Sequence, residues 1–187
     1  MWSTDVLREE HRWILRLLEC LELHCSRSER DGLLESQSAA ELLALCAHFA
    51  DGLHQEREER YLFPRLLSRA RSVAERLEVA RLCGEHEQER HAMGRMSQEL
   101  LGATYGDARS LRGFLSEARQ YVALHRQHVL HENRELLPLA EKLLTPGDDE
   151  VVMQGFVGLE AGGPQKLRRI FERIDALCVH FRVGAPG

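Results

Sequence analysis

The stretch HVLHENRELLP, which runs from His128 to Pro138, contains two pairs of residues that could bind a metal ion. His128 precedes Glu132 by four residues, and His131 precedes Glu135 by the same number. Residues four apart lie one above the other on an α-helix, so either pair could offer an imidazole nitrogen and a carboxylate oxygen to one ion. Such mixed ligands suit iron, manganese or zinc.

A second copy of this pattern distinguishes between the two pairs. HQEREERYLFP, from His54 to Pro64, has the same order of histidine, glutamate four residues later and proline six residues after that. His131 and Glu135 align with Arg57 and Tyr61, which cannot form an equivalent metal site. The repeat therefore favours the first pair and predicts that the second is a solvent-exposed contact on the helix surface. The aligned residues are His54 with His128, Glu58 with Glu132, and Pro64 with Pro138.

Two further histidines lie on the apolar faces of predicted helices. His11 follows Leu7 by one turn, and His86 follows Leu82 by one turn. Each of four helices thus presents a histidine toward a common interior, where unpaired ionisable groups would cost several kcal/mol each. Bound metal ions would compensate that cost. The predicted ligands are His11, His54, Glu58, His86, His128 and Glu132.

The two repeated glutamates predict a dinuclear centre, because a carboxylate one turn from a histidine ligand can reach across and bridge two ions. Two six-coordinate iron ions need about twelve ligand positions, and four histidines with two bridging glutamates fill about eight. A solvent-derived bridge would add about two and leave about two open for water, another side chain or a small ligand. His125, one turn before His128, is a candidate extra ligand or hydrogen-bond partner.

The elements that position these residues are predicted to be four long helices with short links. We expect them at about residues 4–25, 38–70, 72–101 and 107–144, with Pro64 kinking the second. Capping boxes at Ser38–Glu41 and Ser72–Glu75 and a stop at Gly102 mark their ends. The pattern predicts an all-α fold, an up-down four-helix bundle over 1–145. Residues 146–187 are predicted to form a C-terminal helical extension packed on the bundle, with two shorter helices broken at Gly162 and Gly163.

Composition narrows the class of protein. The 187 residues are 43% hydrophobic and 29% charged with a net charge of −5, which is typical of a globular domain. No basic block or long apolar run occurs, so we expect neither nucleic acid nor membrane as a partner. The N-terminus lacks a signal-peptide pattern, and the five cysteines include no CxxC motif, which favours a cytoplasmic protein with free thiols. His24, His48 and His180 lie off the predicted inward faces.

Together, the segments REEHRWI, HQEREERYLFP, GEHEQER and HVLHENRELLP resemble the hemerythrin-like, or HHE cation-binding, family over about residues 5–145. The resemblance implies a four-helix bundle with two non-haem iron ions at the six predicted ligands. Glu58 and Glu132 would bridge these ions. The chain departs from oxygen-carrying members at Arg90, where they have a fifth histidine. His91 and Glu160 are further, weaker candidates, whereas Tyr61 and Tyr121 are expected to be core residues.

The function that this resemblance implies is binding of O₂, NO or a peroxide, in sensing, storage or redox detoxification. One alternative is a di-iron redox enzyme that disproportionates peroxide. Another is a non-catalytic metal-binding bundle, for example with zinc, that acts as a sensor or interaction module. The sequence leaves open whether the chain is an enzyme and whether it binds a protein partner or forms a homo-oligomer.

Overall fold

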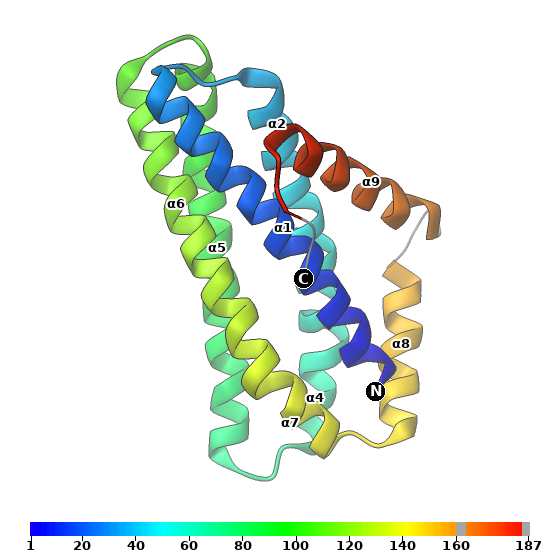
Figure 1. The fold of residues 1–187 in the computed structure, drawn as a ribbon. Helices are drawn as coiled ribbons and strands as arrows, with labels where there is room; N and C mark the ends of the chain where they lie inside the picture. Colours follow the sequence, from blue (N-terminus) through cyan, green and yellow to red (C-terminus); the bar gives the residue numbers. More distant parts are fainter. Residues whose placement is uncertain (160–163, 185–187) are drawn as a thin grey trace.

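Four long antiparallel rods form the body of the molecule in a computed structural model, which describes residues 1–159 and 164–184 (Figure 1). Both α1 and α5 contact the second and the fourth rod, so the rods close into an up-down bundle. The predicted all-α bundle is confirmed. The rods are α1 (Trp2–Asp31); α2 (Ser36–Leu45), η1 (Cys46–His54), α3 (Gln55–Arg57), η2 (Glu58–Leu62) and α4 (Phe63–Arg69); α5 (Val73–Thr104); and α6 (Ala108–His131), η3 (Glu132–Leu136) and α7 (Leu137–Leu143).

Two further helices follow the bundle, α8 (Pro146–Leu159) and α9 (Pro164–Phe181). α8 packs on α1, α3 and η2, and α9 packs on α1 and α2 (Figure 1). Asp149 of α8 accepts hydrogen bonds from the backbone N–H groups of Trp2 and Ser3, at 3.0 and 3.1 Å. These contacts tie α8 to the start of α1, whose first N–H groups have no partner within the helix. A boundary between bundle and extension at residue 145 stays a prediction.

The prolines do not end the helices in which they lie. Pro64 and Pro138 have no N–H to donate, so the residue four positions earlier loses its usual partner. In both rods the chain widens into a π-helical turn just before the proline. The N–H of Phe63 bonds to the carbonyl of Glu58, and the N–H of Leu137 bonds to the carbonyl of Glu132. Both wide turns therefore begin at the repeated glutamates, and the kink expected at Pro64 stays a prediction.

Some helix ends differ from the sequence-based prediction. The capping box at Ser72 and Glu75 is confirmed, with both reciprocal hydrogen bonds present. The box at Ser38 is wrong, because the helix starts two residues earlier and Glu35 caps it. Gly102 does not stop its helix, which continues to Thr104 and ends before Gly106, where φ is +84°. A positive φ suits glycine at a helix end, whereas Gly102 adopts no such conformation.

The first helix is also longer than predicted. It reaches Asp31, and Gly32 ends it with φ of +65°. The polar residues after Cys25 continue the helix along the surface. His24, expected to lie off the inward face, is buried against Phe181 of α9 with ring centroids 5.8 Å apart. Burial lowers its pKa to about 4, so His24 is a neutral residue under the extension.

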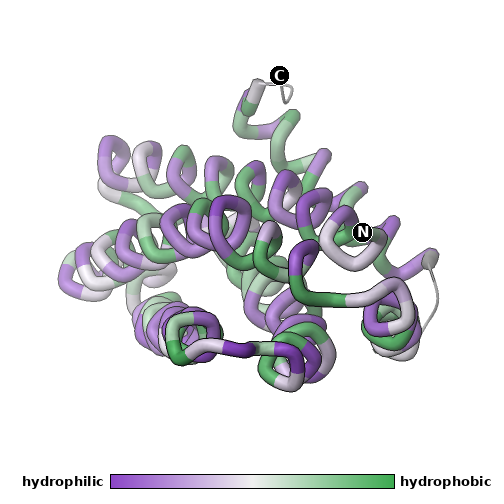
Figure 2. Tube along the Cα trace, turned by 90° about the horizontal axis from the view of Figure 1, so that it is seen from below, coloured by the Kyte–Doolittle hydropathy of each residue, from purple (hydrophilic) through white to green (hydrophobic). Residues whose placement is uncertain are grey.

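A layer of buried polar residues separates two apolar clusters in the bundle. The larger cluster contains Ile14, Phe49 and Phe114, and the smaller contains Leu7 and Leu136. Hydrophilic and hydrophobic residues alternate along each helix, as Figure 2 shows. All five cysteines are free. Among the described residues, no helix combines the length and the apolar character needed to cross a membrane.

Candidate metal centre

The six predicted ligands lie together in the polar layer, and all four rods contribute to it. His54 ends η1 and Glu58 begins η2, while His128 lies one turn before Glu132 at the start of η3. α1 and α5 each add one histidine. The solvent-exposed fraction of every one of these residues is 2% or less, for His11, His54, Glu58, His86, His128 and Glu132.

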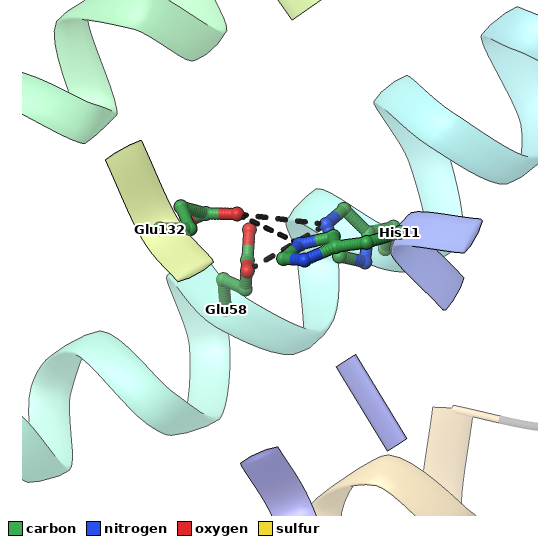
Figure 3. Close-up of side chains that lie close together, drawn as sticks. His11, Glu58 and Glu132 are labelled. Carbon is green, nitrogen blue, oxygen red and sulfur yellow. Dashed lines mark hydrogen bonds and ion pairs between the residues drawn. The ribbon is translucent and has the colours of Figure 1, made fainter. Parts of the chain in front are cut away.

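The six residues form two overlapping groups of four. In each group, one ligand atom from every residue lies within 4.8 Å of the others. The shared members are Glu58 and Glu132, whose carboxylates lie side by side and face the His11 imidazole in Figure 3. The first group is His11, His54, Glu58 and Glu132, and the second is Glu58, His86, His128 and Glu132. Two histidines on either side of a shared pair of carboxylates is the arrangement that a dinuclear centre requires.

All four imidazoles turn the same nitrogen inward. The Nε2 atoms of His11 and His128 lie 3.0 and 3.3 Å from Glu132 Oε2. The Nε2 atom of His86 lies 3.3 Å from Glu58 Oε2, and that of His54 lies 3.6 Å from Glu58 Oε1. The Nε2 atoms of His86 and His128 are 3.0 Å apart. Two facing nitrogen lone pairs repel each other unless a proton or a cation lies between them.

The other ring nitrogen of each histidine contacts an oxygen that sequence reasoning did not identify. Such a partner accepts from Nδ1–H and leaves the Nε2 lone pair free for a metal. Two of these partners could have been found from the sequence. Glu10 and Glu85 each directly precede a predicted histidine ligand, in two Glu-His dipeptides. The Nδ1 contacts are His11 with Asn133 Oδ1 at 3.0 Å, His54 with Glu10 Oε2 at 2.9 Å, His86 with Glu59 Oε1 at 2.7 Å, and His128 with Glu85 Oε2 at 2.9 Å.

The comparison with known families agrees with this geometry. The profile of the hemerythrin HHE cation binding domain matches residues 3–140. The chain belongs to this family. No curated protein and no solved structure matches the chain. The match spans all four rods, so the hemerythrin-like resemblance drawn from the sequence motifs is confirmed.

The hemerythrin-like centre leaves several buried polar atoms without a hydrogen bond. Both oxygens of Glu58, one oxygen of Glu132 and the Nε2 atom of His54 make none. Burial alone would raise the pKa of Glu132, but the charge of His128 and hydrogen bonds from His11 and His128 hold that pKa well below its ordinary value. An unsatisfied buried carboxylate is costly. The unpaired carboxylate oxygens and the four inward-facing imidazole nitrogens therefore fit cations bound between the two carboxylates.

The second histidine–glutamate pair of the opening motif does not form the expected surface contact. His131 Nδ1 instead lies 3.1 Å from Glu85 Oε1, while Glu135 is exposed. The α5 helix packs along α6 and brings Glu85 within reach of both His128 and His131. His131 therefore helps to position the glutamate that supports His128.

The remaining candidates lie outside both groups. His125 contacts Asp51 and Glu89 instead, in a separate cluster. Arg90 is exposed and donates to Gln55 and Glu59, and His91 is exposed as expected for a surface residue. The hydroxyl of Tyr121 donates to Asp51, and the ring of Tyr61 packs against Gly155 of α8. Glu160, Gly162 and Gly163 lie outside the described residues.

Proposed function

We propose that this hemerythrin-like chain is a non-haem di-iron protein that binds O₂, NO or a peroxide. The observation that carries the proposal is the pair of buried carboxylates, Glu58 and Glu132, shared by two groups of histidines. The proposed ligands are the six residues of the two groups. Two iron ions bound there would supply redox chemistry and open positions for a small ligand.

The residues of the chain would hold such ions in a fixed geometry. Each imidazole is oriented by an oxygen at its Nδ1 atom, which keeps Nε2 directed into the centre. The wide turns at Glu58 and Glu132 place both carboxylates at one level of the bundle. Four imidazoles and two bridging carboxylates would fill about eight of about twelve positions around two six-coordinate ions. Arg90, in place of a fifth histidine, supplies no further nitrogen ligand, which supports binding of a ligand from outside.

The direct test is iron loading in air, removal of loose metal by gel filtration, and measurement of iron content and ultraviolet–visible spectra before and after O₂, NO and peroxide. We expect two iron ions per chain and spectral changes with at least one of the three ligands. The matched variant Glu132→Gln keeps the size of the side chain but removes the charge, and should retain less than one iron. Iron content below one in the wild type, or an unchanged content in Glu132→Gln, would refute the proposal.

A redox enzyme is the second candidate, because two iron ions held at Glu58 and Glu132 would supply two-electron redox chemistry toward peroxide. Peroxide turnover by the loaded wild type should then disappear in His54→Ala and Glu132→Ala. Turnover that survives both substitutions would exclude this centre as its source. If the protein instead binds zinc as a structural ion, purified protein should contain zinc and give none of these spectra.

A further inference from the structure

A second polar layer lies next to the candidate metal centre. Asp51, Glu89 and His125 are each three residues from a predicted histidine ligand, on three different rods. Three residues advance about 4.5 Å along an α-helix, so this layer lies about one turn from the centre, toward the link between α5 and α6. The corresponding position on α1 is Ile14, which belongs to the apolar core. The layer is thus polar on three sides and closed by an apolar residue on the fourth.

The three side chains converge on one point. One ligand atom from each lies within 4.8 Å of the other two. The two ring nitrogens of His125 face the two carboxylates, with Nε2 3.4 Å from Asp51 Oδ1 and Nδ1 3.3 Å from Glu89 Oε1. The exposed fractions of the side chains are 2% for His125, 0% for Glu89 and 6% for Asp51. Glu89 and His125 are therefore buried, and little of the Asp51 side chain reaches solvent.

Hydrogen bonds from neighbouring side chains reach only one oxygen of each carboxylate in the cluster. The Tyr121 hydroxyl donates to Asp51 Oδ1 and the Gln55 amide donates to Glu89 Oε2, each at 2.7 Å. Three atoms remain without a hydrogen bond, namely Asp51 Oδ2, Glu89 Oε1 and His125 Nδ1. Each buried unsatisfied atom costs about 1–3 kcal/mol. One proton would satisfy only part of this set, whereas a cation could accept electron pairs from all three side chains.

We propose that Asp51, Glu89 and His125 bind a third divalent metal ion, separate from those at the centre of six ligands. One imidazole with two carboxylates suits Fe²⁺, Mn²⁺ or Zn²⁺. The site offers three protein ligands, fewer than either group of four at the centre, so its affinity is lower and its ion exchanges more readily.

Equilibrium dialysis of the full chain against Mn²⁺, with manganese counted per chain, tests this site. Wild type should bind three ions, the third at least ten-fold more weakly, and Glu89→Gln and Asp51→Asn should each bind two. Glu87→Gln changes a solvent-exposed glutamate of the same helix as Glu89 and should keep all three ions. Circular dichroism shows whether each variant folds, and the two cluster variants change different rods.

A further variant separates this proposal from the proposed function. Glu132→Gln weakens the centre, so an ion that it retains and that the double variant Glu89→Gln/Glu132→Gln loses belongs to the cluster. One ion in wild type, lost in Glu89→Gln but kept in Glu132→Gln, would support the cluster and refute the di-iron centre. Two ions in wild type, both kept in Glu89→Gln and Asp51→Asn, would overturn the third site.

Discussion

The two halves of the bundle, residues 1–70 and 72–144, build the centre in the same way but support it differently. In each half a Glu-His dipeptide supplies one predicted histidine ligand and the glutamate that holds the next histidine. The residue after each shared glutamate holds the histidine of the opposite half. The equivalent residues are His11 and His86, Glu10 and Glu85, His54 and His128, Glu58 and Glu132, and Glu59 and Asn133.

The two halves differ in the residues that contact the supporting glutamates Glu10 and Glu85. In the first half Arg57 pairs with Glu10, and its guanidinium carbon lies 5.3 Å from the centre of the Phe156 ring of α8. Arg57 is 0% exposed. In the second half the position of Arg57 is taken by His131, which is 27% exposed and contacts Glu85. The repeat therefore places four of the six predicted ligands, while the contact with Phe156 of α8 is made by Arg57 of the first half, which is buried.

The largest expected contrast concerns the arginines of the two halves. Arg57→Met removes a buried charge that Glu10 needs, so we expect a loss of about 3–5 kcal/mol in the free energy of unfolding. Arg81→Met removes a partner of Glu85 that is 36% exposed, and should cost less than about 1 kcal/mol. Urea unfolding of the metal-free proteins measures both. Equal losses would mean that α8 does not seal the first half.

Metal affinity should show a smaller contrast between the supporting glutamates. Glu10→Gln should weaken the binding of the first two ions by about 10–100-fold, because it removes the negative charge beside a ligand histidine at a buried position that water cannot reach. Glu85→Gln should weaken it by less than about ten-fold, since Glu85 is 18% exposed and water can take over part of its role. Competition with a coloured chelator gives both values. If Glu85→Gln weakened metal binding more than Glu10→Gln, the second half of the site, and not the first, would be the one shielded from water.

The smallest contrast tests the packing of α8 against Tyr61 in the first half. A methyl group at Gly155 would overlap the ring of Tyr61, so Gly155→Ala should cost about 1 kcal/mol in the free energy of unfolding. Gly158 lies in the same helix with no neighbouring atom within 4 Å, so Gly158→Ala should be neutral or stabilising by up to about 1 kcal/mol. Thermal unfolding of the two variants compares them directly. A neutral Gly155→Ala would show that α8 does not dock on Tyr61 in solution.

The repeat explains how much of the site could be predicted from sequence. Histidine, glutamate and proline recur at fixed spacing in two helices, and helical geometry then places their side chains on one face. That pattern led to six residues which the structure brings together, and to the family. The repeat did not predict that Tyr61 packs against Gly155 of α8, or that His131 contacts Glu85 in place of Glu135.

The supporting residues could not be predicted in the same way. Glu10 and Glu85 act on histidines of a neighbouring rod, and contacts between rods depend on rotation and register that a helical wheel of one segment does not contain. The burial of His24 could not be predicted for the same reason, since α9 covers a face of α1 that looks outward in the bundle alone. The predicted start of a helix was wrong where several polar residues could cap it. At the second helix Glu35 is the N-cap, whereas the sequence suggested Ser38.

The most direct test of the di-iron centre is anomalous diffraction at the iron edge from crystals of the iron-loaded chain. We expect two strong peaks beside the carboxylates of Glu58 and Glu132, one within bonding distance of His11 and His54 and the other within bonding distance of His86 and His128. A single peak beside these two glutamates, or none there, would contradict the di-iron centre.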